Sequence, residues 1–255
     1  MKNKWDDSLL STNKNETLWE LFHVNSRCSH FSFTNIKHEH TKKIEKAEIT
    51  PYINYPAISL PNINKELNMP LVSAIKNRTS KQNMVPGQFN LEDIANLLLS
   101  SYSLKDHHYS RHAPSAGALY PIEIYFHFSG QKSDIDPALY YYNPLQKELR
   151  QLTNKNCNTQ VQNILMQPEL VENSSLQIFL TAVFSRSTKK YSDRGYRFAF
   201  LEAGHIAQNI NLIATAMNLA SINIGGYYEE EANKFLKIDG LYQSVIYMVL
   251  VGNHS

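Results

Sequence analysis

The deciding stretch of this sequence reads Arg111-His112-Ala113-Pro114-Ser115-Ala116-Gly117-Ala118-Leu119-Tyr120-Pro121. Its small residues let a backbone approach a planar or phosphorylated ligand closely, and Pro114 fixes the geometry with which the chain enters the turn. The same composition is equally typical of a plain tight turn before a strand. Only the surrounding sequence separates the two interpretations.

One helix is predicted on each side of this stretch. Asn90 is a good N-cap with Asp93 three residues later, and it predicts a helix that ends near Ser101. A long helix is predicted over residues 200–219. Its apolar stripe has helical spacing and consists of Ala203, Ile206, Ala207, Ile210, Ala214 and Met217. We expect this helix to lie in the core, and a second interpretation is that part of its face also forms a dimer interface.

Runs of β-forming residues predict several strands. The first, residues 122–128, directly follows the deciding stretch. The others are residues 139–142 and 148–152, joined as a hairpin by residues 143–146, and residues 176–184 and 245–251. The last strand is nearly continuous in Val, Ile, Met and Leu, so we expect it to be central and buried on both faces. Strands that alternate with helices predict an α+β or mixed α/β domain around one sheet, with the strand order left open.

The first 65 residues differ from the rest because they are polar, rich in Asn and poor in clear periodicity. We interpret residues 1–65 as an N-terminal arm or lobe draped over the main domain, with a short helix around residues 18–22. Residues 66–255 form the main domain. A total length of 255 residues suits one large domain with such a smaller lobe.

Composition and charge exclude several classes of protein. Hydrophobic residues make up 42% and charged residues 19%, which argues against global disorder. The formal net charge of +2 is too small for the clustered basic excess of a nucleic-acid-binding surface. No apolar run approaches the ~20 residues of a membrane span, and the N-terminus lacks the apolar core of a signal peptide. We therefore expect a cytoplasmic protein that binds neither nucleic acid nor a membrane.

The cysteines and histidines form neither a disulfide framework nor a metal-binding motif. Cys28 and Cys157 make no Cys-x-x-Cys pair, and a disulfide between them stays open. Among the ten histidines, His38-Glu39-His40 is too tight for the i, i+4 spacing of a helical zinc site, and the adjacent His107 and His108 diverge on most backbones, so no metal site is expected. Gly-x-Gly-x-x-Gly, Walker and Gly-x-Ser-x-Gly motifs are absent as well, which argues against a Rossmann or P-loop nucleotide site.

Three further motifs carry chemistry, each beside a plainer interpretation. Arg78-Thr79-Ser80 suits a phosphate, because a guanidinium binds it through two hydrogen bonds and Ser adds one more, although Arg-x-Ser is common on protein surfaces. Gly225-Gly226 can expose backbone N–H groups to a ligand edge, or simply form a turn. Lys190-Tyr191 can provide a base, because a neighbouring cation favours a phenolate that accepts a substrate proton; on chance alone such a pair is usually surface. The Ser, Asp and Gly that follow this pair favour a loop, in which both side chains could converge.

Taken in order, these pieces resemble the SagB-type branch of the nitroreductase superfamily, the flavin-dependent azoline dehydrogenases of thiazole/oxazole-modified peptide biosynthesis. The resemblance covers roughly residues 65–252. It is specific in the combination of residues 114–121 with the block Leu201-Glu202-Ala203-Gly204-His205. The other matching segments are Arg78-Thr79-Ser80, residues 190–198, residues 206–209 and Gly225-Gly226, and more loosely residues 21–23 and 25–26.

The resemblance implies an α+β, nitroreductase-like FMN-binding fold with a central, mostly antiparallel sheet flanked by helices and one long central helix. It also implies a homodimer with flavin at the subunit interface, which gives the dimer interpretation of the long helix more weight. The implied FMN contacts are Arg78, Thr79, Ser80 and Gln82 at the phosphate and ribityl chain, Pro114, Ser115, Ala116 and Gly117 along the flavin, and Gly225 and Gly226 at the isoalloxazine edge. The implied catalytic pair is Lys190 and Tyr191.

Two departures from the family pattern concern the phosphate. Gln82 stands where many nitroreductases carry a basic residue. The chain ends at Gly252-Asn253-His254-Ser255, without the C-terminal Arg or Lys of many relatives. Phosphate binding would then depend more on Arg78, or on another basic residue.

The implied reaction is oxidation of a peptide thiazoline or oxazoline to the azole. Tyr191, tuned by Lys190, would remove the acidic ring proton while hydride passes to the flavin, which molecular oxygen would reoxidise. The implied partners are the peptide substrate and subunits of a cyclodehydratase complex. A related reaction, oxidation of an azoline or pyrroline on a nonribosomal peptide carrier, would leave the same sequence pattern and stays open as an alternative.

Two other functions stay open. One is an NAD(P)H-dependent nitroreductase or quinone reductase, which shares the FMN site but needs no Lys-Tyr base. The other is a non-catalytic scaffold, with or without flavin, in a peptide-modifying complex. The missing C-terminal basic residue is the feature that supports the scaffold.

Overall fold

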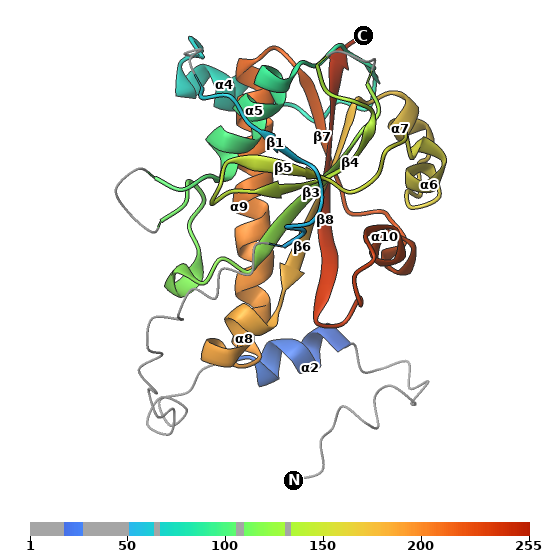
Figure 1. Ribbon diagram of the computed structural model, residues 1–255. Coiled ribbons are helices and arrows are strands. Elements are labelled where there is room, and N and C mark those ends of the chain that lie inside the picture. Colours follow the sequence, from blue (N-terminus) through green and yellow to red (C-terminus); the bar gives the residue numbers. More distant parts are fainter. Residues whose placement is uncertain (1–17, 28–50, 64–66, 106–109, 131–133) are drawn as a thin grey trace.

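The computed structural model describes residues 18–27, 51–63, 67–105, 110–130 and 134–255 (Figure 1). Its helices are α2 (Leu18–Asn25), α4 (Leu71–Asn77), α5 (Leu91–Tyr102), the 3₁₀ helix η1 (Ala116–Ala118), α6 (Asn158–Gln162), α7 (Glu169–Glu172), α8 (Ser185–Tyr191), α9 (Arg194–Ala216) and α10 (Glu229–Leu236). Its strands are β1 (Ala57–Ser59), β2 (Met84–Val85), β3 (Ile122–Phe128), β4 (Ala138–Asn143), β5 (Glu148–Gln151), β6 (Leu176–Val183), β7 (Ala220–Ile224) and β8 (Gln243–His254).

The described strands form one sheet in the order β1-β5-β4-β3-β6-β8-β2, with β7 paired to β8. All of these strand pairs are antiparallel. β8 pairs with β6 along most of its length and with β7 and β2 towards its C-terminal end. Its residues 248–252 are buried, so the central position predicted from the apolar run is confirmed.

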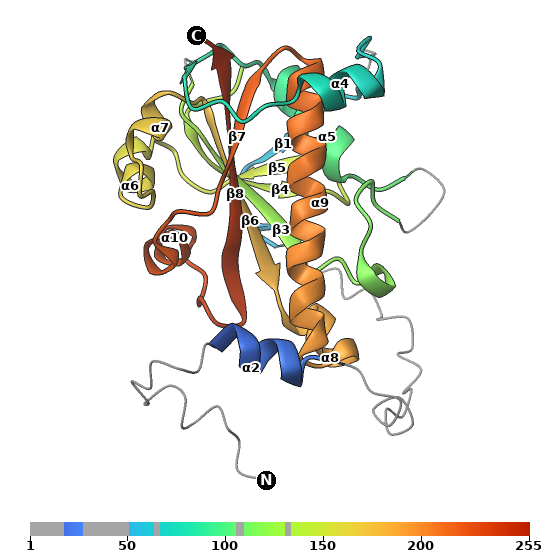
Figure 2. The same ribbon diagram turned by 180° about the vertical axis from the view of Figure 1, so that it is seen from behind.

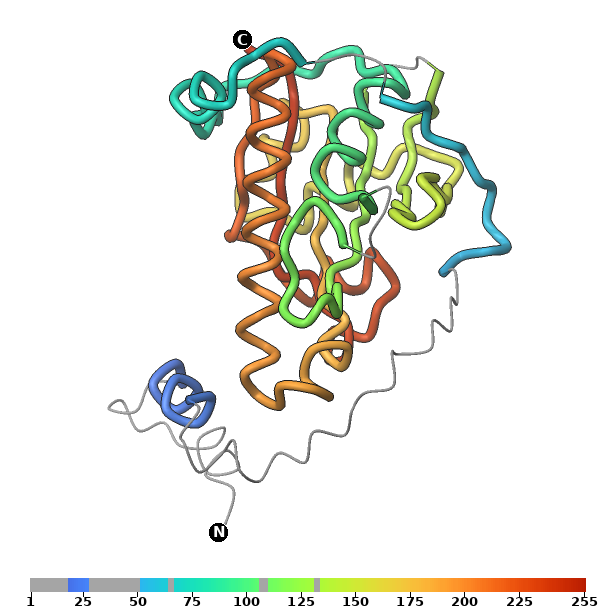
Figure 3. The backbone as a smooth tube through the Cα atoms, turned by 90° about the vertical axis from the view of Figure 1, so that its left-hand side faces the viewer, coloured from blue at the N-terminus to red at the C-terminus, as the bar shows by residue number. Residues whose placement is uncertain are grey.

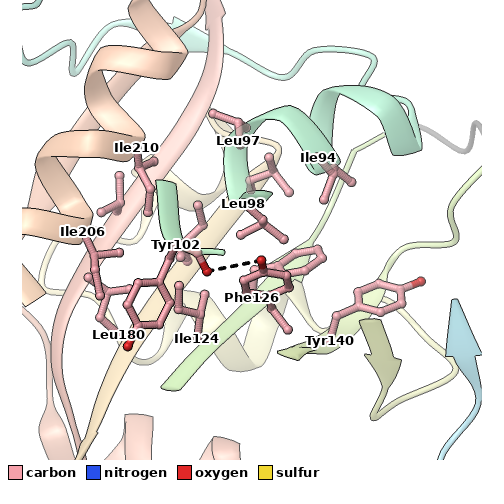
Figure 4. Packing of buried hydrophobic residues seen from close by; sticks show 14 of the residues in the cluster. Ile94, Leu97, Leu98, Tyr102, Ile124, Phe126, Tyr140, Leu180, Ile206 and Ile210 are labelled. Atoms are coloured by element: carbon pink, nitrogen blue, oxygen red, sulfur yellow. Dashed lines mark hydrogen bonds between the residues drawn. The ribbon is translucent and has the colours of Figure 1, made fainter. Parts of the chain in front are cut away.

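The sheet separates two hydrophobic cores. On one face, Ile124 and Phe126 of β3 pack under α5 and α9, against side chains such as Leu98 and Ile206 (Figure 4). Figure 2 shows α9 running along this face. On the opposite face, Tyr125 of β3 packs with apolar residues of α6, α7 and α10. Because both faces are covered, β3 is buried at every position, although successive side chains of a strand point in opposite directions.

Most of the predicted elements are confirmed. β3 has the predicted bounds, and the predicted hairpin is β4–β5. In its turn, the Leu145 N–H donates to Asn143 Oδ1 at 3.0 Å. Asn90 and Asp93 form a reciprocal capping box at the start of α5. The predicted α+β fold, an antiparallel sheet flanked by helices with one long helix, is therefore confirmed.

Three local predictions are wrong. Lys190 and Tyr191 lie in the last turn of α8, not in a loop. This short helix packs so closely on α9 that a Cβ added at Gly195 would lie 2.6 Å from the carbonyl carbon of Ser187, and such packing stabilises helices that propensity alone does not. The long helix begins at Arg194 and ends at Ala216, both earlier than predicted. Gly225 follows β7, a strand that the sequence did not predict.

The described part of the N-terminal arm touches the main domain at two places. β1 extends the sheet by pairing with β5. α2 lies across the start of α9, where the Phe22 ring meets the Tyr196 ring edge-on at 5.3 Å and Arg197 Nη2 donates to the His23 carbonyl at 2.8 Å. The division of the chain at residue 65 stays a proposal.

Other expectations concern cysteines, metals and membranes. Cys157 is a buried thiol, and Cys28 lies outside the described residues. Across the described ranges, no group of three or more His, Cys, Asp and Glu side chains is arranged to hold a metal ion. Among the helices that the structure describes, none has the length and apolar character needed to cross a membrane.

Candidate functional site

The deciding stretch folds into a tight turn with an unusual backbone. Gly117, Ala118 and Tyr120 have φ values of 62°, 53° and 47°. This left-handed region costs little for Gly but is unfavourable for residues with a Cβ. Two contacts hold the turn closed: Ser115 Oγ accepts from the Tyr120 N–H at 2.9 Å, and the Arg111 N–H donates to Tyr120 Oη at 2.9 Å. The turn is therefore a fixed element that leaves Gly117 exposed to solvent.

Lys190 and Tyr191 meet this turn at Gly117. A Cβ added at Gly117 would lie 2.6 Å from Tyr191 Oη and 2.9 Å from Lys190 Nζ. Lys190 Nζ lies 5.3 Å from the centre of the Tyr191 ring. The structure thus brings the predicted catalytic pair together with the predicted flavin-lining turn, although the two are far apart in the sequence. Only a residue without a side chain leaves room for both polar tips at this point.

The position of the pair is fixed from behind by α9. The Tyr191 ring packs edge-on against Phe198 at 5.0 Å between centroids. The close approach of α8 and α9 at Gly195 fixes the position of α8 relative to α9. The two tips that reach Gly117 therefore come from a helix that is itself held rigidly. Such pre-organisation is what a proton-transferring group requires.

A buried polar cluster lies beneath the turn. Tyr102 Oη donates to Glu202 Oε1 at 2.8 Å. The Arg111 guanidinium lies between the rings of Tyr102 and Tyr120, 4.6 Å from each centroid, in a favourable cation–π arrangement. Within the described chain, Nε and Nη1 of Arg111 have no hydrogen-bond partner. These contacts connect the start and end of the turn to the inner faces of α5 and α9.

Glu202 gives this cluster a pH dependence. Burial raises the pKa of its carboxyl above the ordinary value of 4.5, although the Tyr102 hydrogen bond and the charge of Arg111 act in the opposite direction. The folded state therefore holds this proton more tightly than the unfolded state. By linkage, the contribution of Glu202 to stability falls as the pH rises from the unfolded pKa to the folded pKa.

We expect Glu202→Gln to remove the pH-dependent loss of stability that Glu202 causes. An amide has nearly the same shape, still accepts from Tyr102 and carries no charge to desolvate. The free energy of unfolding of the variant, minus that of the original chain, should therefore increase as the pH rises from about 4 towards neutrality. Urea denaturation of both proteins without added cofactor, at a series of pH values, measures this difference. A difference that stays constant with pH would show that Glu202 does not titrate in this range.

The segment that contains Arg78, Ser80 and Gln82 lies near the C-terminal end of α9, whereas α8 lies near its N-terminal end (Figure 1). Ser80 forms a parallel bridge with Ser221 at the start of β7, and the Lys81 N–H donates to the Ser221 carbonyl at 3.0 Å. A cavity of 290 Å³ opens beside this segment and is lined by Met69, Asn77, Thr79, Lys81, Thr215, Asn218, Leu219 and His254. Of the four predicted phosphate and ribityl contacts, only Thr79 lines this cavity.

Gly225 and Gly226 directly follow the end of β7. A Cβ added at Gly225 would have no atom within 4 Å, whereas one at Gly226 would touch Met166 Sδ at 3.4 Å. The Gly226 carbonyl accepts from the Met166 N–H at 3.1 Å. Because β7 begins at the bridge to Ser80, it connects the 78–82 segment directly to this open glycine.

The predicted contacts therefore fall into two groups that one chain does not bring together. α4 and the 78–82 segment lie near the C-terminal end of α9, whereas α8 lies at its N-terminal end (Figures 1 and 3). The helix has 23 residues, which corresponds to about 34 Å at 1.5 Å per residue. Arg78 and Tyr191 are thus separated by roughly the length of this helix.

Four residues with a place at the site were missed by the sequence analysis: Arg186, Glu202, Lys81 and His254. One signal could have found Glu202, because a carboxylate on the apolar stripe of a long helix is expected to be buried and paired. Lys81 and His254 are basic residues beside the two positions where the family pattern is broken. Arg186 of α8, which pairs with Glu123 and donates to the Tyr120 carbonyl, has no local signal because both partners lie far away in the sequence.

Comparisons with known proteins agree with this fold. The sequence profile described as "Nitroreductase family" matches residues 75–253. Over 181 residues the chain is 26% identical to a Methanocaldococcus jannaschii protein provisionally named nitroreductase MJ1384, covering 71% of this chain and 89% of that one. Over 159 residues it is 29% identical to the Escherichia coli microcin B17-processing protein McbC, covering 60% of this chain and 58% of McbC.

Solved structures show the same similarity. A provisionally named nitroreductase from Anabaena variabilis superposes with a TM-score of 0.72 at 27% identity, covering 91% of this chain but only 45% of that one. The Escherichia coli microcin synthetase McbBCD complex with truncated pro-MccB17 bound gives a TM-score of 0.60 at 22% identity, covering 93% and 92%. A Desulfovibrio desulfuricans structure in complex with FMN gives 0.50 at 14% identity, covering 74% and 88%, which indicates a shared fold alone.

Proposed function

This chain belongs to the nitroreductase family, and we propose that it is an FMN-dependent azoline dehydrogenase of the SagB type. It would oxidise thiazolines or oxazolines in a peptide to thiazoles or oxazoles. The observation that carries this proposal is the convergence of Lys190 Nζ and Tyr191 Oη on Gly117. A reductase that only passes electrons through a flavin has no need for a phenol and an ammonium group at that point.

The residues present fit FMN. Gly225 offers exposed backbone with open space around its Cα, which suits a flat ring that approaches a strand end. Arg78 and Lys81 bring positive charge to one end of α9, and His254 lines the same cavity as Lys81, as a phosphate site requires. The family and the neighbour solved with FMN support the same cofactor.

In our proposal the FMN contacts divide between two regions of the chain. Arg78, Thr79, Ser80 and Gln82 hold the phosphate and ribityl chain, with Lys81 supplying the charge that Gln82 lacks. Pro114, Ser115, Ala116 and Gly117 lie along the flavin ring, and Gly225 and Gly226 lie at its edge.

A site built from these two regions needs a second copy of the chain. About 34 Å of helix lies between them, which is well beyond the reach of one mononucleotide. A two-fold axis across α9 would place the C-terminal end of one α9 beside the N-terminal end of the other. The outer faces of α9 and α4 suit such a contact, because Leu201, Leu71 and Val72 are 59%, 67% and 61% exposed. We therefore propose a homodimer with two composite sites.

When bound, FMN supplies the acceptor for the two electrons and one hydrogen that leave the azoline ring as hydride. The chain itself moves the remaining proton. Tyr191 is the proposed base for the acidic ring proton, and Lys190 places a positive charge beside its ring. The turn at Gly117 fixes the point at which these two polar tips meet it.

The proposed partners are a peptide substrate and the subunits of a cyclodehydratase complex in the cytoplasm. McbC, to which the chain is similar, is a microcin B17-processing protein, and the McbBCD complex was solved with a truncated precursor peptide bound. Aromatisation of an azoline requires a preceding cyclisation, so an enzyme that forms the ring must act first.

The second candidate function is an NAD(P)H-dependent nitroreductase. The match to the Methanocaldococcus jannaschii protein favours it, since that similarity covers more of both chains than the match to McbC does. This function would use the same flavin site and leave Lys190 and Tyr191 without a catalytic role.

The visible spectrum of the purified protein, followed by turnover of an azoline-containing peptide, tests the proposal. We expect the absorption bands of oxidised flavin and a mass loss of two hydrogens per ring. Rapid bleaching of the flavin by NADPH without azoline turnover would favour the nitroreductase. A colourless protein that does not take up FMN, yet assists a cyclodehydratase, would leave only a scaffold role.

A further inference from the structure

Arg186 connects the helix of the predicted catalytic pair to the turn at Gly117. It lies at the start of α8, and its Nη1 donates to the Tyr120 carbonyl at 3.1 Å. The same nitrogen pairs with Glu123 Oε1 of β3 at 2.5 Å. One guanidinium therefore binds both the last part of the turn and the central sheet.

Glu123 is built to hold this guanidinium. Its side chain is only 9% exposed, and its second oxygen accepts from Tyr141 Oη at 2.6 Å. A buried carboxylate with both oxygens occupied has one preferred orientation, and it is costly unless a cation stays beside it. Glu123 thus fixes the position of the Arg186 side chain. Because Arg186 belongs to α8, the same contact holds α8 in position against the sheet.

Helix geometry makes the connection direct. Arg186 and Lys190 are four residues apart on α8, so they lie on the same face in successive turns. Arg186 binds the turn at Tyr120, and the tips of Lys190 and Tyr191 reach it at Gly117. Movement of α8 relative to the turn would break the first contact and displace the second. The ion pair with Glu123 anchors Arg186 to β3, the strand that directly follows the turn.

We propose that Arg186, held by Glu123, is a positioning residue that keeps Lys190 and Tyr191 against the Gly117 turn. Its catalytic consequence rests on the proposed azoline oxidation, whereas its effect on the position of Tyr191 does not. Arg186 acts through Tyr191 and touches no reacting atom itself.

A double-mutant cycle with Arg186→Met and Tyr191→Phe tests the catalytic part. We expect Arg186→Met to lower kcat for azoline oxidation by about 10- to 100-fold, because small misplacements of a catalytic group have effects of this size. The same change in the Tyr191→Phe background should have almost no effect, since the group that Arg186 positions is already gone. Arg186→Lys, which keeps the charge, should recover part of the rate.

Two further variants separate positioning from folding. Removing Arg186 alone leaves a buried carboxylate unpaired, so Arg186→Met/Glu123→Gln provides a neutral version that should fold and remain slow. Arg150→Met is the matched control: Arg150 also pairs with a carboxylate, Glu148, and donates to the Ile53 and Tyr55 carbonyls, but it lies on β5. We expect it to lower the denaturation midpoint and leave kcat unchanged.

A readout without substrate tests the positioning itself. Fluorotyrosine placed at position 191 gives one ¹⁹F resonance, which should shift or broaden in Arg186→Met and stay in place in Arg150→Met. An unchanged resonance, or rate losses that multiply in the cycle, would overturn the inference. If the original enzyme fails to oxidise azolines but the resonance responds to Arg186→Met, the positioning role stands and the proposed function fails.

Discussion

Tyr191→Phe is expected to lower kcat for azoline oxidation by about 10²- to 10⁴-fold, the usual contribution of a general base, and to leave FMN bound. Phenylalanine keeps the ring that packs on Phe198 and removes only the oxygen that faces Gly117. The variant should therefore fold normally and remain yellow. Turnover of an azoline peptide by mass spectrometry, together with the flavin spectrum, measures both expectations.

Tyr242→Phe is the control for this experiment. Tyr242 is 69% exposed in the turn before β8, so loss of its hydroxyl should change neither flavin content nor rate. If Tyr191→Phe retained the rate of the original enzyme, the phenol would not be the base. The convergence at Gly117 would then need another explanation, such as contact with the peptide backbone of the substrate.

Elements whose signals are local could be predicted from the sequence. The capping box of Asn90 and Asp93 involves residues three apart, and it marks the start of α5 correctly. The strand residues of β3 form a continuous run after Pro121. In such cases the propensity of the residues and the tertiary structure favour the same conformation.

Elements that depend on distant partners could not be predicted. α8 contains Ser185, Arg186, Ser187 and Thr188, most of which are weak helix formers, and it becomes helical where Gly195 allows α9 to approach. β7 is a mixed segment whose strand character comes from pairing with β8. The three residues of β1 are a strand because β5 offers them an edge.

The candidate site shows the same division. Each predicted residue belongs to a short motif, and the motifs point to flavin chemistry only as a set. No spacing in the sequence shows which motifs meet. Gly117 and Tyr191 meet through α8, whereas Arg78 directly follows α4, which lies at the other end of α9. Contacts of this kind are set by the packing of helices on the sheet, which no spacing in the sequence reveals.

This separation leads to the second large effect, which two inactive variants should show when they are mixed. Arg78→Ala removes the proposed phosphate contact, and Tyr191→Phe removes the proposed base. In a mixed dimer, one composite site would combine Arg78 of one subunit with Tyr191 of the other and be intact. The other site would carry both changes. Statistical exchange gives half mixed dimers with one good site each, so about a quarter of the original activity should return.

Subunit exchange is essential to this result, so each variant must be incubated with the other under mild denaturant and refolded before assay. Each variant refolded alone should stay inactive. If the mixture also stayed inactive while native mass spectrometry showed mixed dimers, Arg78 and Tyr191 would not belong to one composite site. Arg78 would then have no role at the flavin, because α9 holds it too far from Tyr191 for one mononucleotide to reach both.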